Sequence, residues 1–97
     1  MPEPGRKNFV TKSIGAHNIY SDWVPLQGVF NFSLSGTFAG TVHVQRSFDK
    51  GVTPSDVDSF TAVTEQVGYE PEAVVWYRAG IKTGGYTSGT AVVRLGQ

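Results

Sequence analysis

Residues 28–34, with the sequence Gly-Val-Phe-Asn-Phe-Ser-Leu, alternate apolar and polar side chains more clearly than any other part of this chain. Phe30, Phe32 and Leu34 fall on one side of an extended strand, and the polar residues between them fall on the other. This pattern is typical of an antiparallel sheet that buries one face and leaves the other in water. The stretch therefore predicts a half-buried antiparallel strand.

Further runs with β-strand character lie on both sides of this strand, and turn residues separate them. They cover residues 9–14, 40–48, 59–67, 73–81 and 90–95. Helical periodicity is nearly absent, and the turns recur about every 8–12 residues, as in β-sandwiches and small barrels. We therefore expect an all-β fold, a small antiparallel β-sandwich of Ig-like or jelly-roll type with about six to eight short strands.

The length of 97 residues predicts one domain. We place this domain at residues 9–97, with residues 9–14 as an edge strand. Residues 1–8 are polar and contain Pro2, Pro4 and Gly5, so they are expected to form a flexible N-terminal arm. They include no apolar segment of the kind that a secretory signal needs.

Glycine-containing segments mark the expected turns. Ser35-Gly36 predicts a turn after the first strand, and Ser88-Gly89-Thr90 repeats the same chemistry near the C-terminus. Residues 68–72 are expected to be a polar connection. Residues 83–89 are expected to form a loop.

The apolar positions of the remaining runs predict which side chains are buried. In residues 40–48, Val42, Val44 and Phe48 share one face. Trp76 follows Val74 and Val75 in the middle of residues 73–81, and we expect it to pack in the core. In the last strand, Ala91, Val93 and Leu95 form the apolar face. Much of the expected core consists of these residues together with Phe30, Phe32 and Leu34.

Charge and cysteine content exclude several classes of function. Eight basic residues balance eight acidic residues, and charged residues make up 16% of the chain, below the roughly 25% of ordinary domains. A neutral chain has no strong field to attract nucleic acid or an anionic membrane. The absence of cysteine excludes disulfides and thiol catalysis. The weakly charged surface favours contacts with partner proteins.

Catalytic patterns are absent from the sequence, so we expect a non-enzymatic protein. The histidines are His17 and His43, and no Gly-x-Ser-x-Gly motif accompanies them. His43 falls on the polar face of its strand. The acidic residues Glu65, Glu70 and Glu72 flank the expected connection and are expected to face water, without the opposed pairing that glycoside hydrolysis needs.

Metal and cofactor patterns are missing as well. Asp49, Asp56 and Asp58 fall within one region and are expected to be solvated carboxylates, because their spacing matches no EF-hand. Two histidines without ligand spacing do not make a zinc site. We therefore expect no metal and no cofactor.

Two aromatic side chains in expected loops are candidates for recognition. Trp23 and Tyr86 could contact a neighbouring subunit or form a platform for a sugar ring. Base stacking would require a basic groove, which the balanced charge does not supply. A carbohydrate-binding module therefore remains an alternative function.

The segment 47–54 resembles an Asp-box, the pattern Ser-x-Asp-x-Gly-x-Thr followed by an aromatic residue. Ser47, Asp49, Gly51 and Thr53 match this pattern, and Pro54 stands where the aromatic would be. Aspartate side chains bond nearby backbone N–H groups, and glycine adopts positive φ readily. The motif therefore predicts a turn and carries no activity.

A wider stretch, residues 32–51, resembles a segment of small bacteriophage virion structural proteins. Their pattern is Ser-Gly-Thr-x-x-Gly-Thr-Val followed by Gln-Arg-Ser-Phe-Asp and a glycine turn, which here falls on residues 35–51. Residues 77–78, 87–90 and 93–95 are similar too, so the resemblance covers most of residues 28–97.

The resemblance implies a virion protein of β-sandwich type. Its expected role is capsid decoration (cement), in which the subunit stabilises the head by bridging capsid subunits; a neck, tail or fibre component is the alternative. The implied partners are the major capsid protein or other virion proteins, and we expect a homo-oligomer located in the virion, assembled in the host cytoplasm. Phe9, Trp23, Tyr86 and the arm are the candidate contacts.

Overall fold

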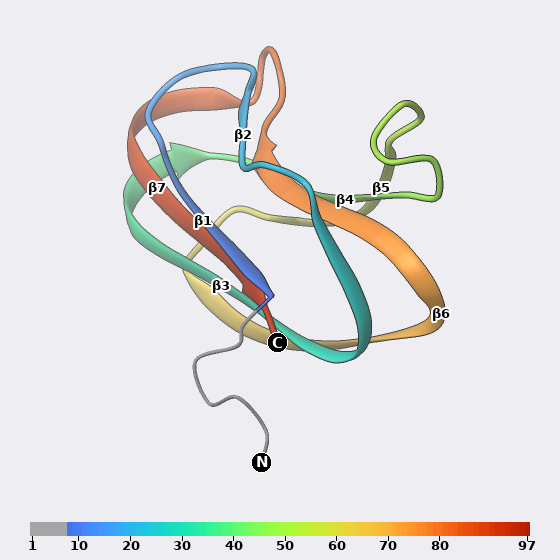
Figure 1. Ribbon diagram of the computed structural model, residues 1–97. Coiled ribbons are helices and arrows are strands. Elements are labelled where there is room, and N and C mark those ends of the chain that lie inside the picture. The colour runs from blue at the N-terminus through green and yellow to red at the C-terminus, as the bar shows by residue number, and fades with distance from the viewer. Residues whose placement is uncertain (1–7) are drawn as a thin grey trace.

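The structure is a computed structural model that describes residues 8–97. That part of the chain contains seven strands and no helix (Figure 1). The strands are β1 (Phe9–Ile14), β2 (Ile19–Tyr20), β3 (Val24–Gly40), β4 (Val42–Ser47), β5 (Ser55–Phe60), β6 (Thr64–Ile81) and β7 (Tyr86–Gly96). The expectation of an all-β protein is confirmed.

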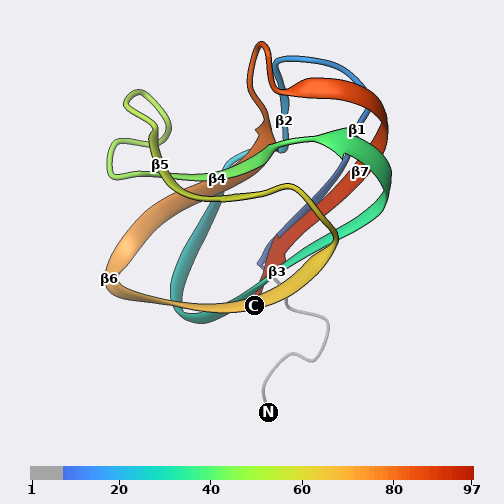
Figure 2. The same ribbon diagram turned by 180° about the vertical axis from the view of Figure 1, so that it is seen from behind.

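The strands form one antiparallel sheet with the order β1-β7-β3-β6-β4-β5, and β2 pairs with the end of β6. β3 and β6 span 17 and 18 residues, about three times the usual strand length of 5–6 residues. Both long strands bend, so that the sheet curves around its own interior (Figures 1 and 2). This bent sheet is compatible with the small β-sandwich expected from the sequence.

Each long strand contributes to two parts of the sheet. In the first half-sheet, β1 pairs with β7, and β7 pairs with residues 31–40 of β3. Residues 28–34 of β3 pair in turn with residues 64–70 of β6. In the second half-sheet, residues 24–26 of β3 pair with residues 75–77 of β6, and β4 and β5 follow. The pairing is irregular between Leu26 and Gly28, where the two halves meet.

The core lies on the concave side of the bent sheet and contains the alternating residues of the strands. The side chains that share a buried apolar environment are Ile14, Val24, Leu26, Phe30, Phe32, Leu34, Val42, Val44, Val75, Tyr77, Ala79, Ile81, Ala91, Val93 and Leu95. The alternation in residues 28–34 and in residues 91–95 therefore predicted the buried faces correctly. Residues 9–14 form the expected edge strand.

Two predicted core positions are wrong, one because it lies beyond the end of its strand and the other because it lies on the outer face of its strand. Phe48 follows the last residue of β4 and is exposed. Trp76 is half-buried, because the inner face of β6 goes to Val75 and Tyr77 on either side of it. Apolar residues next to a strand end or on its outer face do not reach the core.

The turn predicted at Ser35-Gly36 is wrong, because β3 continues through it to Gly40. Gly89 likewise lies inside β7. The two segments lie side by side, with Thr37 opposite Thr90 and Phe38 opposite Gly89. Gly36 and Gly89 have φ of 97° and 82°, and a Cβ at Gly36 would lie 2.4 Å from the carbonyl oxygen of Thr90. The Ser-Gly-Thr sequence at residues 35–37 and 88–90 therefore places one glycine with positive φ in each of two paired strands.

The boundaries between residues 55 and 81 also differ from the prediction. The run expected at residues 59–67 is interrupted at residues 61–63, between β5 and β6. The polar connection expected at residues 68–72 is part of β6. Its polar side chains are accommodated because this part of the strand lies at the edge of the core, as described below.

The two ends of the described chain lie next to each other. Phe9 pairs with Gly96, and the backbone N–H of Gln97 donates to the carbonyl oxygen of Asn8. Residues 1–7 of the expected arm lie outside the described residues. Within residues 8–97, the search for a helix long and apolar enough to cross a membrane finds none.

Candidate binding groove and outer face

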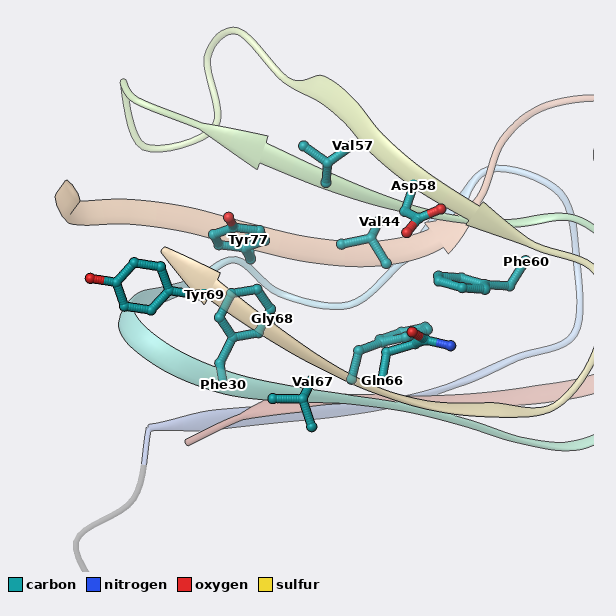
Figure 3. A pocket seen from close by; sticks show the side chains of 11 residues that line it. Phe30, Val44, Val57, Asp58, Phe60, Gln66, Val67, Gly68, Tyr69 and Tyr77 are labelled. Carbon is teal, nitrogen blue, oxygen red and sulfur yellow. The ribbon is translucent and has the colours of Figure 1, made fainter. Parts of the chain in front are cut away.

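A groove of about 220 Å³ lies between β5 and the first part of β6 (Figure 3). These strands follow each other in the chain and are joined by residues 61–63, but they do not pair with each other. β5 pairs with β4 along one edge, and residues 64–70 of β6 pair with β3 along one edge. Within residues 8–97, no strand pairs with the other edge of either segment.

Aromatic rings form the floor of the groove. The ring of Phe32 stacks on that of Phe60, with centroids 5.3 Å apart, and the ring of Phe30 lies 4.8 Å from that of Tyr77. Figure 3 shows Val57, Asp58 and Phe60 on the β5 side and residues 66–69 on the β6 side. The groove thus has an apolar floor and walls made by two strand edges.

Gly68 makes room for one of these rings. It lies directly opposite Phe30 in the pairing of β3 with β6. A Cβ at Gly68 would lie 2.6 Å from Cζ of Phe30, which is closer than van der Waals contact allows. The ring of Phe30 therefore covers the glycine backbone, an arrangement that pairs an aromatic with a glycine across two strands.

Glu70 lies beside the groove and is buried, with 1% of its surface exposed. The prediction that this carboxylate faces water is therefore wrong, whereas Glu65 and Glu72 are exposed as expected. The Oε1 atom of Glu70 accepts hydrogen bonds from Arg46 Nη2 at 2.6 Å and from Tyr77 Oη at 2.7 Å, and Oε2 accepts from the backbone N–H of Glu72 at 3.0 Å. An ion pair and two further hydrogen bonds thus compensate for the burial.

This network changes the acidity of two groups. Burial by itself raises the pKa of Glu70, but the hydrogen bonds from Tyr77 and Glu72 and the charge of Arg46 outweigh it and hold that pKa below its ordinary value. Burial, together with the neighbouring carboxylate of Glu70, raises the pKa of the Tyr77 hydroxyl above its ordinary value. Glu70 therefore carries a charge and Tyr77 stays neutral, so the pair is suited to a structural role.

The groove lies in an acidic part of the chain. Residues 55–72 contain five of the eight Asp and Glu residues and no Lys, Arg or His. Lys82 pairs with Asp56, and Arg46 pairs with Glu70. Asp58 is exposed in the groove wall, where it accepts a hydrogen bond from its neighbour Ser59. β1 and β7, in contrast, contain Lys12 and Arg94 and no acidic residue.

The outer face of the first half-sheet carries exposed apolar side chains. Val29 lies opposite Tyr69, and the two are 62% and 68% exposed. Val67 is 73% exposed, and Phe9 is 48% exposed at the other end of the half-sheet. We call these four residues the outer apolar face. The guanidinium of Arg94 lies 5.0 Å from the ring centroid of Phe9.

The Asp-box-like residues lie in one hydrogen-bonded turn between β4 and β5. Ser47 Oγ donates to Asp49 Oδ1 at 2.5 Å and accepts from the backbone N–H of Gly51 at 2.9 Å. The backbone N–H of Thr53 donates to Asp49 Oδ1 at 2.8 Å. Hydrogen bonds from Ser47 and Thr53 lower the pKa of Asp49 to about 2. Lys50 and Gly51 have φ of 60° and 96°.

Trp23 connects this turn to the second half-sheet. A Cβ at Gly51 would lie 2.4 Å from Nε1 of Trp23, so the turn approaches the indole closely. The guanidinium of Arg78 lies 4.6 Å from the Trp23 ring centroid and 3.9 Å from that of Tyr20. Arg78 Nε also donates to Gln45 Oε1 at 2.8 Å. The ring of Trp23 thus packs against this chain on one face.

The other candidate contacts have separate surroundings. Tyr86 begins β7, where its hydroxyl donates to the carbonyl oxygen of Gly89 and its ring lies 5.5 Å from that of His17. Phe9 lies on the outer apolar face and covers Gly96. No aromatic contact joins Phe9, Trp23 and Tyr86 within the described residues. The structure therefore does not gather them into one site.

The histidines and carboxylates are dispersed. Nδ1 of His17 accepts from the backbone N–H of Gly84 at 3.0 Å, and His43 lies in β4. Residues 8–97 contain no group of three or more His, Asp or Glu side chains placed to hold a metal ion.

Sequence reasoning missed the groove and the outer apolar face. The signals were present in part, since Val67 and Tyr69 share one side of a strand and residues 55–72 contain five acidic residues and no basic residue. Val29 and Tyr69 are 40 positions apart in the chain, and their pairing is visible only once strand order is known.

Comparison of the chain with models of protein families, with curated proteins and with solved structures finds no match.

Proposed function

We propose that this protein is a non-enzymatic structural subunit of a bacteriophage virion that decorates and stabilises the head. The outer apolar face carries this proposal. It spans β1, β3 and β6 on one side of the first half-sheet, so its residues are presented together to a partner. A group of exposed apolar side chains on one face is typical of a surface that contacts another molecule.

The polar residues around the outer apolar face suit a contact of moderate affinity that is repeated in many copies. Asn31, Ser33 and Thr11 lie among the apolar residues and offer hydrogen-bonding groups at the same surface. A decoration subunit binds a symmetric shell in many copies, so that modest contacts add up to a large stabilisation. The resemblance of residues 32–51 to small virion proteins supports the same role, with the major capsid protein as partner.

The experiment is co-sedimentation of the purified protein with empty heads of the phage whose genome encodes it. We expect binding that saturates at a fixed ratio to the capsid subunit. Replacing Val29 and Val67 by Thr keeps the shape of both side chains and adds polar hydroxyl groups. Since burial of a valine contributes about 1.5 kcal/mol or more, the double variant is expected to bind at least tenfold more weakly.

Val52→Thr is the matched control, because Val52 is 81% exposed in the turn after β4 and lies outside the outer apolar face. It should bind as the unmodified protein does. Equal weakening in control and test variants, or no binding of the unmodified protein to heads, contradicts the decoration role. Binding to isolated necks, tails or fibres in place of heads supports the alternative position in the virion.

The carbohydrate-binding alternative is tested separately by titrating saccharides against tryptophan fluorescence. Because Arg78 covers one face of the Trp23 ring and Gly51 lies close to its Nε1 edge, we expect no response. A saturable change that is lost in Trp23→Ala would replace the decoration proposal with sugar binding.

A further inference from the structure

Within residues 8–97, the first half-sheet ends on each side in a strand edge that pairs with no further strand. β1 ends it on one side, and residues 64–70 of β6 end it on the other. Every pairing between these ends is antiparallel, so β1 runs opposite to the first part of β6. A second copy placed beside the first can therefore pair its β1 antiparallel with β6 and extend the sheet.

The register of the sheet shows which residues would meet on the outer side. Phe9, Gly96, Asn31 and Val67 are consecutive partners across β1, β7, β3 and β6. Continuing this row without a shift places Phe9 of the second copy beside Val67 of the first. Both side chains are more than 45% exposed in the single chain, and their contact would bury apolar surface.

The inner side of the same pairing leads into the groove. Val10, Lys12 and the buried Ile14 lie on one side of β1, and Phe9 lies on the other. In the unshifted register, Val10 of the second copy would lie beside Gln66, which lines the groove. In the same register Lys12 would lie beside Thr64, next to the connection 61–63 and within the acidic segment 55–72.

Charge favours this contact over a symmetric one. Pairing two β5–β6 edges would bring together two segments that each hold five acidic residues and no basic residue. Pairing two β1 edges would bring together two strands whose charged residue is Lys12 in each. Only the head-to-tail arrangement of these two edges places a basic strand against an acidic one, and opposite charges steer and orient such contacts.

We propose that β1 of one copy adds to the free edge of β6 residues 64–70 in the next copy, with Val10 directed toward the groove and Lys12 toward the acidic segment 55–72. This contact goes beyond the proposed decoration role, because it joins copies of the chain in the absence of a shell. A head-to-tail contact of this kind builds rings where its rotation closes and filaments where it does not.

Cross-linking tests the contact directly, because the chain has no native cysteine. In one copy, Phe9 and Val67 are three strand spacings apart, about 14 Å, which is too far for a disulfide. The double variant Phe9→Cys/Val67→Cys is therefore expected to form a ladder of disulfide-linked copies on mild oxidation. Phe9→Cys/Val52→Cys is the control, and its residue 52 lies in the turn after β4.

A charge reversal is an independent test of the same contact, measured by sedimentation at low salt. Lys12→Glu is expected to weaken self-association about tenfold, because it places an acidic side chain against the acidic segment 55–72. Lys50→Glu, in the exposed turn, should leave self-association unchanged. Circular dichroism confirms that each variant is folded.

Two results overturn the proposal. One is a monomer at every concentration, in which case Lys12 protects the edge strand from pairing. The other is equal cross-linking in the control variant. Head binding is measured on the same variants, so that loss of self-association with retained head binding separates this contact from the decoration role.

Discussion

At the scale of single residues, the buried carboxylate of Glu70 fixes the place where β6 passes from one half-sheet to the other. It accepts hydrogen bonds from Arg46 in β4, Tyr77 in the second part of β6 and the backbone of Glu72. The two half-sheets are therefore joined by charge and hydrogen bonds as well as by the apolar core. Removing the charge of Glu70 leaves the guanidinium of Arg46 without its anionic partner.

Glu70→Gln is expected to lower the free energy of unfolding by about 2 kcal/mol, the contribution of a hydrogen bond to a charged group. Denaturant titration at pH 7 measures the change. The folded-state pKa of Glu70 is lowered, so its stabilising effect is full above the ordinary value of 4.5 and is lost as pH falls through the lower value. The difference between variant and unmodified protein should therefore shrink below pH 4.5.

Gly68→Ala tests the packing of the groove floor. The added methyl group would displace the ring of Phe30, and we expect a loss of about 1 kcal/mol of stability. Gly15→Ala is the control, since its Cβ would find its nearest neighbours at 3.7 Å. Thermal unfolding compares the two, and equal stability of both variants would contradict the close contact between Phe30 and Gly68.

At the scale of elements, the turn between β4 and β5 depends on Asp49. Its carboxylate accepts from Ser47 and Thr53, and these bonds hold its pKa near 2. A lowered pKa stabilises the folded state above the ordinary value of 3.8, and this stabilisation is lost as pH falls toward 2. The turn is therefore expected to weaken in acid.

Asp49→Asn is expected to destabilise the protein at pH 7, and its deficit relative to the unmodified protein should shrink between pH 3.8 and about 2. Urea titrations at several pH values measure this difference. A deficit that stays constant over that range would show that the charge of Asp49 does not support the turn.

Strands were predictable from the sequence where alternation is uninterrupted, as in residues 28–34 and 91–95. The errors have a common physical cause. Gly36 looks like a turn residue, but it lies in a bend opposite Ala91, because its missing side chain lets two backbones approach. Glu70 looks like a surface residue, but Arg46 and Tyr77, which are distant in sequence, provide its partners. Local pattern does not contain these long-range pairings.

At the scale of the whole molecule, the outer apolar face and the strand edges have different roles in the proposed assembly. The outer apolar face would meet the shell, and the β1 and β6 edges would join neighbouring copies. Of the candidate contacts predicted from sequence, Phe9 lies where both roles meet, whereas Trp23 and Tyr86 pack against their own chain. Sequence could not place the groove, since it arises from β5 and β6 separating after a short connection.

The most direct test of the decoration role is a cryo-electron microscopy comparison of phage heads with and without this protein. The proposal predicts additional density at symmetric positions on the outside of the shell, with Val29, Val67 and Tyr69 facing the capsid subunits. Heads without the protein should also lose stability on heating. Density located only at the neck, tail or fibres, or heads that are identical in both samples, would contradict the decoration role.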